Sequence, residues 1–82
     1  MNEFRDLILQ DADFTESDLS SSVFENCDLA GALFENSILE KADFRTSINY
    51  TIDPEKNIMK KARFSLSGLP GLLAKYNIDI DA

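Results

Sequence analysis

The stretch FRDLILQDADFTESDLSSSVFENCDLAGALFENSILEKADF, from Phe4 to Phe44, places a large apolar residue at every fifth position. Phenylalanine and leucine alternate along it without a break. An α-helix, with a period of about 3.6, and a β-strand, with a period of about 2, cannot produce this spacing. A five-residue period instead predicts a chain that turns a corner at each repeat around a central axis. The series is Phe4, Leu9, Phe14, Leu19, Phe24, Leu29, Phe34, Leu39 and Phe44.

A second series lies two positions before each large residue and is mostly small. Residues two apart in an extended segment point to the same side, so both series face inward. The residues between and after them are mostly polar and therefore face outward. The small series is Ala12, Ser17, Ser22, Cys27, Ala32, Ser37, Ala42 and Ser47, with Leu7 as the exception.

Segments such as Ala12-Asp13-Phe14 and Cys27-Asp28-Leu29 resemble the A(D/N)LXX motif of pentapeptide-repeat proteins. The resemblance covers residues 2–46 and resumes over 62–69. It implies an all-β fold, a right-handed quadrilateral parallel β-helix of about four coils with about 20 residues each. The resemblance also implies a bacterial, cytoplasmic protein.

A coil of about 20 residues can be tested on the sequence itself. It stacks Phe4, Phe24, Phe44 and Phe64 on one face, and it returns Met59 to the core after an interruption. It also predicts a vertical ladder of alternating charge, which we expect from Arg5, Glu25 and Arg45.

Two segments depart from the repeat. Asn49 and Pro54 occupy core positions, so we expect residues 48–58 to form an outward loop within a β-helical region that spans residues 1–69. Residues 70–82 are expected to form a capping helix and tail. Leu69, Leu72, Leu73 and Tyr76 follow helical spacing, Pro70 suits the first turn, Asn77 suits the exit, and residues 78–81 alternate as a strand or a cover would.

Composition argues against catalysis and against cofactors. The chain has no histidine, so Ser-His, Cys-His and histidine–metal arrangements are absent. We predict no catalytic residues, no metal and no cofactor. Cys27 falls in the small inward series, where a buried side chain is the expected role, and a single cysteine suits a reducing cytoplasm.

Charge is divided unevenly along the chain. Residues 1–40 carry a net charge of −9 and residues 41–82 a net charge of +2, within a total of −7. This disfavours direct binding to nucleic acid or membrane, and it indicates either a solvated acidic surface or a face for a basic partner. The candidate partner surface consists of Asp13, Asp18, Glu25, Asp28, Glu35, Ile38 and Ile58.

Two functions remain open from the sequence. The first is a protein-binding scaffold without catalysis. The second follows only from the resemblance: some pentapeptide-repeat proteins mimic DNA, bind DNA gyrase or topoisomerase IV, and protect them from fluoroquinolones or toxins. Because nothing polar covers the first coil, we also expect either a longer repeat protein or a homodimer through the N-terminal end.

Overall fold

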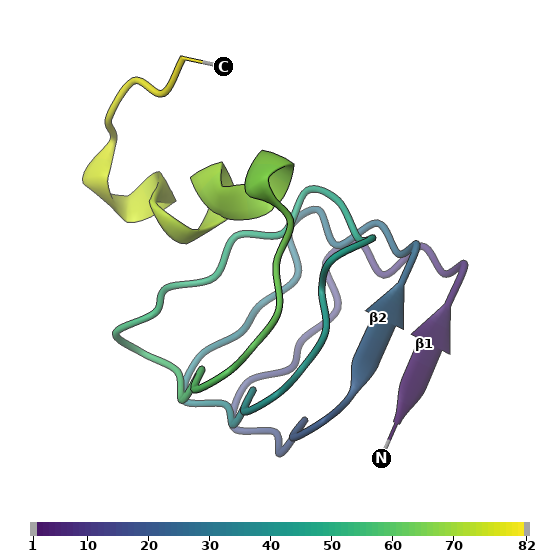
Figure 1. The fold of residues 1–82 in the computed structure, drawn as a ribbon. Coiled ribbons are helices and arrows are strands. Elements are labelled where there is room, and N and C mark those ends of the chain that lie inside the picture. Colours follow the sequence, from purple (N-terminus) through teal and green to yellow (C-terminus); the bar gives the residue numbers. More distant parts are fainter. Residues whose placement is uncertain (1, 82) are drawn as a thin grey trace.

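The computed structural model describes residues 2–81. The predicted β-helical region begins at Met1 and the predicted cap and tail end at Ala82, and these two residues lie outside the described range. The backbone winds as a parallel β-helix (Figure 1). Strand β1 (Glu3–Arg5) pairs in parallel with β2 (Val23–Glu25), so that Phe4 lies beside Phe24. Single bridges continue this 20-residue register, for example from Ile8 to Asp28 and from Asp43 to Arg63.

Corners occur where the backbone takes a left-handed conformation. Most of these residues lie two positions after a member of the large apolar series, as at Asp11, with φ 62°, and Asn36, with φ 54°. The next amide closes the turn, as when Ala12 donates to the Leu9 carbonyl at 3.2 Å. This conformation costs most residues about 1–2 kcal/mol, and Gly, Asn and Asp tolerate it best. The chain can therefore bend every five residues without a helix or a long strand.

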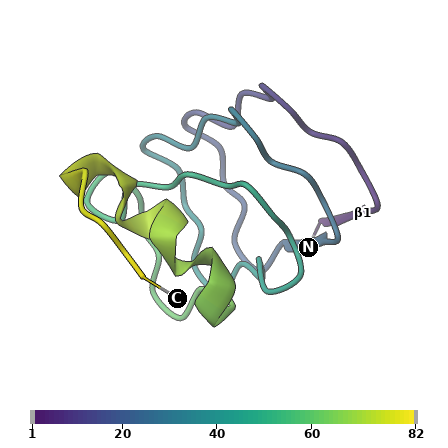
Figure 2. The same ribbon diagram turned by 90° about the horizontal axis from the view of Figure 1, so that it is seen from above.

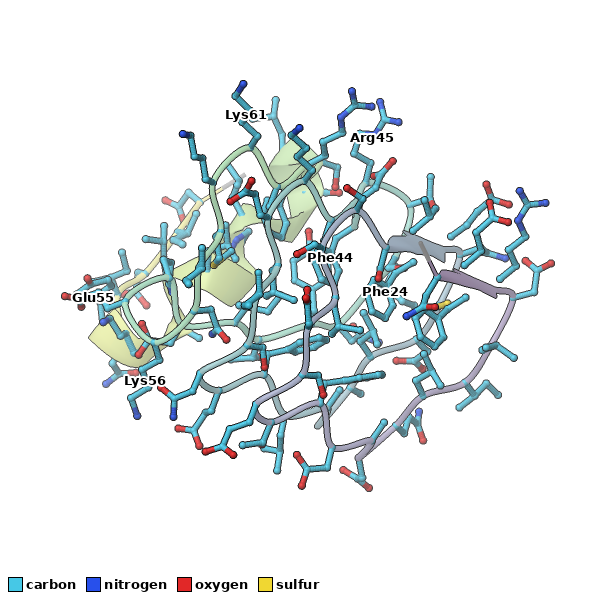
Figure 3. All side chains as sticks on the ribbon, turned by 90° about the horizontal axis from the view of Figure 1, so that it is seen from below. Phe24, Phe44, Arg45, Glu55, Lys56 and Lys61 are labelled. Atoms are coloured by element: carbon cyan, nitrogen blue, oxygen red, sulfur yellow. The ribbon has the colours of Figure 1, made fainter. Side chains whose placement is uncertain are left out.

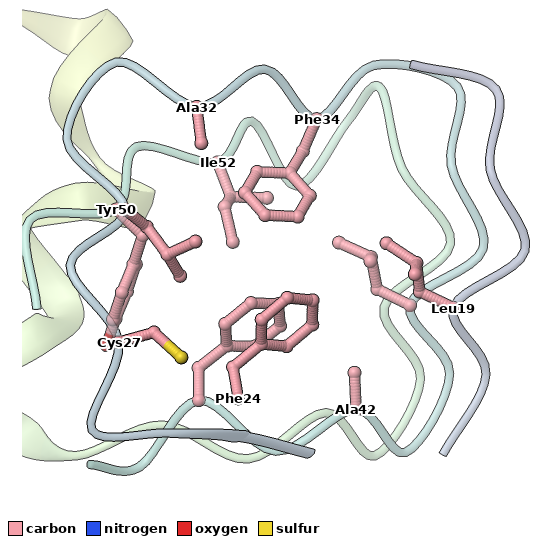
Figure 4. Close-up of a cluster of buried hydrophobic side chains, with 11 residues drawn as sticks. Leu19, Phe24, Cys27, Ala32, Phe34, Ala42, Tyr50 and Ile52 are labelled. Atoms are coloured by element: carbon pink, nitrogen blue, oxygen red, sulfur yellow. The ribbon is translucent and has the colours of Figure 1, made fainter. Parts of the chain in front are cut away.

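Rings stack along two faces of the coil and fill its interior. The ring of Phe44 lies 4.8 Å from that of Phe24 and 5.3 Å from that of Phe64. Phe34 faces these rings from the opposite side and meets Phe44 edge-on at 5.7 Å (Figure 4). Six members of the predicted core are buried: Leu19, Phe24, Leu29, Phe34, Leu39 and Phe44. The other five are half-buried and pack against them: Phe4, Leu9, Phe14, Met59 and Phe64.

The sequence series missed two core residues inside the predicted loop at 48–58. Tyr50 and Ile52 are buried, and the Tyr50 ring lies between those of Phe44, at 5.7 Å, and Phe64, at 5.6 Å. Their alternation around an exposed Thr51 is a strand-like signal that a five-residue period hides. Within this segment, the exposed turn is formed around Pro54.

The cap differs from the predicted helix in the residue at which it begins and in the type of helix. Two 3-10 helices, η1 (Leu66–Leu72) and η2 (Ala74–Tyr76), lie at the end of the coil opposite β1 (Figures 1 and 2). Pro70 stands inside η1 rather than in a first turn, because the helix begins four residues earlier than expected. Proline lacks a donor, and Gly68 and Gly71 lie within two residues of it, which suits a short 3-10 segment.

Packing onto Tyr50 explains the glycines of η1. A Cβ atom on Gly68 would overlap the Tyr50 hydroxyl, and one on Gly71 would overlap the Tyr50 carbonyl oxygen. The Ile52 amide donates to the Gly71 carbonyl at 3.0 Å. Only Leu72 of the predicted apolar stripe packs against the core.

Of the two arrangements that the sequence left open for residues 78–81, a strand or a cover over apolar surface, the structure excludes the strand. Asn77 ends η2 in the left-handed conformation, with φ 49°. Residues 78–81 form no strand, and Ile80 instead borders an apolar hollow beside Leu66, Leu69 and Leu73 of the cap. The tail therefore lies with the cap and does not extend the sheet.

Candidate partner surface

One face of the coil brings three of the predicted partner residues together. Ile38 forms parallel bridges with Asp18 on one side and Ile58 on the other. The exposed fraction is 36% for Ile38 and 56% for Ile58, although both are apolar. This face, defined by Asp18, Ile38 and Ile58, thus presents a carboxylate beside two stacked isoleucines.

The aspartates at the centres of the faces have a structural role, because they fix the corners of the coil. Asp13 accepts a hydrogen bond from the Thr15 amide at 2.9 Å, and Asp18 accepts one from the Ser20 amide at 3.1 Å. An acceptor placed two residues before an amide fixes a turn, and here it fixes the corner that follows. The aspartate of the repeat motif therefore holds the corner in shape and remains at the surface.

Hydrogen bonds keep these carboxylates ionised. The side-chain and amide donors of Thr15 lower the pKa of Asp13, and those of Ser20 lower the pKa of Asp18. Asn49 contributes most to the lowered pKa of Asp28, since its amide nitrogen donates to the carboxylate at 3.1 Å. All three aspartates carry full negative charge at neutral pH.

The other predicted partner residues lie elsewhere. Asp13 bridges to Leu33 on one face, and Asp28 bridges to Ile8 and Ile48 on another. Glu25 and Glu35 are exposed corner residues. The predicted set therefore does not form one site: its seven members are spread over several faces and corners.

The predicted charge ladder is only half present. Arg5 lies 3.7 Å from Glu25, as expected, but it also lies 3.3 Å from Glu3. Arg45 pairs with Asp43 at 2.9 Å rather than with Glu25, which corrects the prediction. Asp43 lies two residues away on the same segment, so the local pair forms at little conformational cost.

The five-residue repeat of this chain matches a known protein family. Residues 8–45 match the family model for pentapeptide repeats, in eight copies. The chain carries pentapeptide repeats. This confirms the family to which the sequence was compared, and pentapeptide repeats imply a β-helix. No curated protein matches the chain.

Pentapeptide periodicity also explains the small inward residues. The Ser37 hydroxyl donates to the Phe14 carbonyl at 2.6 Å, and the Ser47 hydroxyl donates to the Phe24 carbonyl at 2.5 Å. Cys27 follows the same pattern, because its thiol lies 3.3 Å from the Phe4 carbonyl oxygen. Each of these bonds joins one coil to the preceding one, and the Cys27 side chain is buried.

Two features of the pentapeptide-repeat surface were absent from the predicted partner set. An apolar hollow of about 430 Å³ lies between η1 and the tail. A row of cationic side chains includes Lys41 and Lys61, whose spacing of 20 residues could have been read from the sequence. Among residues 2–81, no group of His, Cys, Asp and Glu side chains could hold a metal ion, and no helix is long and apolar enough to cross a membrane.

Proposed function

We propose that the chain is a non-catalytic scaffold that binds another protein in the cytoplasm through the outer faces of a pentapeptide-repeat coil. We further propose that the coil is right-handed and four-sided, with about four turns. Parallel bridges beginning at Glu3, Ile8, Asp13 and Asp18 support four sides in each 20 residues.

One observation carries the scaffold proposal. Positions where an aspartate would fix the following corner hold exposed Ile8, Leu33, Ile38, Ile48 and Ile58 instead. Such a residue cannot make the corner hydrogen bond, and it exposes apolar surface to water. Both changes disfavour the isolated fold, so a gain in binding explains them better than stability does. The face with Asp18, Ile38 and Ile58 is the best candidate, because its two isoleucines are stacked neighbours.

The partner face can be tested with a pair of double variants. Ile38→Ser/Ile58→Ser removes the stacked isoleucines, while Ile8→Ser/Ile48→Ser removes two exposed isoleucines from another face without changing charge. Affinity capture with each purified chain as bait, followed by quantitative mass spectrometry, compares their partners. We expect partners of the unsubstituted chain to be lost from the first variant and retained by the second. Equal retention by both would exclude this face.

DNA mimicry is the second candidate. Ionised Asp13, Asp18 and Asp28 on the outer faces favour it, since an acidic rod can occupy a site for duplex DNA. The molecule is 35 Å in its longest dimension, and duplex DNA of that length carries on the order of 20 charges. The net charge of −7 is far smaller. The charge density of residues 1–40 alone is comparable with DNA, so mimicry requires those residues to face the enzyme.

A supercoiling assay separates the two candidates. Gyrase is incubated with plasmid, a fluoroquinolone and micromolar amounts of the chain. Mimicry predicts inhibition of supercoiling or protection from the drug, and Glu25→Gln/Glu35→Gln should weaken the effect without disturbing the corner-fixing aspartates. Unchanged supercoiling and cleavage would remove this candidate and leave the scaffold proposal standing.

Self-association at the end that carries β1 is also proposed. Phe4 is only half-buried there. A second copy stacked on this end would cover its ring. Light scattering that gives the mass of a monomer at all concentrations would exclude a homodimer.

A further inference from the structure

The cationic side chains of residues 2–81 fall into two groups. One group lies close to carboxylates: Arg5 is 3.3 Å from Glu3, Lys56 is 3.2 Å from Glu35, and Lys75 is 3.0 Å from Asp53. Arg45, next to one edge of the coil, is likewise 2.9 Å from Asp43. At that edge, four cations have no carboxylate within ion-pair distance among the described residues, although the chain holds 15 acids against 8 bases. These four residues, the basic edge, are Lys41, Lys60, Lys61 and Arg63.

The fold gathers the basic edge from two successive coils. Lys41 and Lys61 are the left-handed residues of two stacked corners, both with φ 60°. The Lys41 amide donates to the Lys60 carbonyl at 3.0 Å, and the Arg63 amide donates to the Ala42 carbonyl at 2.8 Å. Lys61 projects away from the coil on the same side as Arg45 in Figure 3. Residues far apart in the sequence thus form one continuous edge.

A shallow groove of about 390 Å³ runs along the basic edge. It is lined by Ser21, Val23, Lys41, Asp43, Lys61 and Arg63. Asp43, the acid in this groove, is already bound by the Arg45 guanidinium at 2.9 Å. The groove therefore presents three cations, a hydroxyl, one apolar side chain and the Asp43 carboxylate, whose charge Arg45 offsets.

The basic edge is an electrostatic exception in an acidic molecule. Residues 40–45 and 60–63 contain two acids, Glu40 and Asp43, and five bases, which gives a net charge of +3. The remainder of the chain therefore carries −10. Charges farther apart than a Debye length of about 8–10 Å are largely screened at physiological salt, so a ligand confined to this edge experiences mainly its positive charge.

We propose that the basic edge docks an acidic segment of a partner polypeptide. A small free anion would make only ion pairs and would bind too weakly, because each exposed pair raises affinity about fivefold at most and three pairs give a dissociation constant near 10 mM. A polypeptide segment can add contacts with the Ser21 hydroxyl and the Val23 side chain of the groove. Duplex DNA, about 20 Å wide, would extend from the edge over the acidic faces and be repelled. An extended peptide with acids at alternate positions presents carboxylates about 6.6 Å apart on one side, so several of them can face the basic edge at once.

This surface is separate from the face with Asp18, Ile38 and Ile58. The inference rests on the proposed function only in treating the chain as a protein-binding scaffold. It involves different residues, so the isoleucine variants described above leave it untouched. Failure of either proposal can therefore be recognised without the other.

The test uses the full chain and a fluorescein-labelled peptide in which Glu and Ser alternate, followed by fluorescence anisotropy. Lys41→Asn/Lys61→Asn removes two cations from the basic edge. Asparagine adopts the left-handed backbone more readily than lysine, so this variant keeps its corners. The matched control, Arg5→Asn/Lys56→Asn, makes the same change in net charge at two exposed positions elsewhere.

We expect binding that weakens with added salt and that falls about fivefold or more in Lys41→Asn/Lys61→Asn. The control should bind like the unsubstituted chain. Equal binding by both variants, or equal loss in both, overturns the proposal. Displacement of the peptide by inorganic phosphate at equal molar concentration, tighter binding of a DNA duplex, or salt-sensitive dimerisation that requires Lys41 and Lys61 also overturns it, because another occupant would then fit better.

Discussion

Replacing Phe44 by leucine should destabilise the chain about twice as much as replacing Phe4. Phe44 is fully buried, and its ring meets four others: Phe24 at 4.8 Å, Phe64 at 5.3 Å, and Phe34 and Tyr50 at 5.7 Å. The half-buried Phe4 meets only Phe24, at 4.7 Å, and Phe14, at 6.0 Å. The two substitutions therefore sample the middle and the end of one stack.

The magnitude follows from the number of ring pairs. Each aromatic pair adds about 0.5–1.5 kcal/mol beyond the burial of apolar area, and leucine keeps most of that area. Phe44→Leu should therefore lower the free energy of unfolding by about 2–6 kcal/mol and Phe4→Leu by about 1–3 kcal/mol. A domain of this size has a total of about 4–12 kcal/mol, so Phe4→Leu should remain folded, and complete unfolding of Phe44→Leu alone would also count as the larger loss.

Urea denaturation followed by far-ultraviolet circular dichroism measures both losses, since the chain contains no tryptophan. The slope of each transition must be compared first, because an altered slope signals a change in the unfolded ensemble. Equal losses for the two variants, with unchanged slopes, would refute a continuous ring stack that is weaker at its end.

Further predictions concern the cap, acid stability and the thiol. Gly71→Ala should lower the free energy of unfolding by about 1–3 kcal/mol, because its Cβ would overlap the Tyr50 carbonyl oxygen; an unchanged melting temperature would contradict this close packing. The pKa of Asp28 is lowered in the folded state, mainly by Asn49, so this group stabilises the fold above its usual pKa and the effect is lost as pH falls through the folded value. Asp28→Asn should consequently flatten the acid side of the stability–pH curve, and an unaltered curve would oppose this assignment. Cys27 is 1% exposed, so its reaction with a thiol reagent should follow opening of the fold and accelerate in Phe44→Leu; rapid labelling of the native chain would indicate an accessible thiol.

Repetition made the coil predictable from the sequence. A five-residue alternation leaves few ways to bury nine large side chains, and the resemblance to pentapeptide repeats implied a coil of about 20 residues, which the pairing of Phe4 with Phe24 supports. The same argument placed Ile38 beside Ile58. It did not reveal why aspartate recurs, because the hydrogen bond from Asp13 to the Thr15 amide depends on the bend of the backbone.

The sequence by itself determined the winding of this protein, since burial of a periodic apolar series depends only on local spacing. The tertiary structure alone decided where the series ends: Tyr50 and Ile52 enter the core and Gly71 packs against them, through contacts between segments with no common period. It also decided which charges pair. Arg45 pairs with Asp43 rather than with the expected Glu25, and Lys41 and Lys61 have no carboxylate partner among residues 2–81. These outcomes depend on side-chain positions that only the folded coil sets.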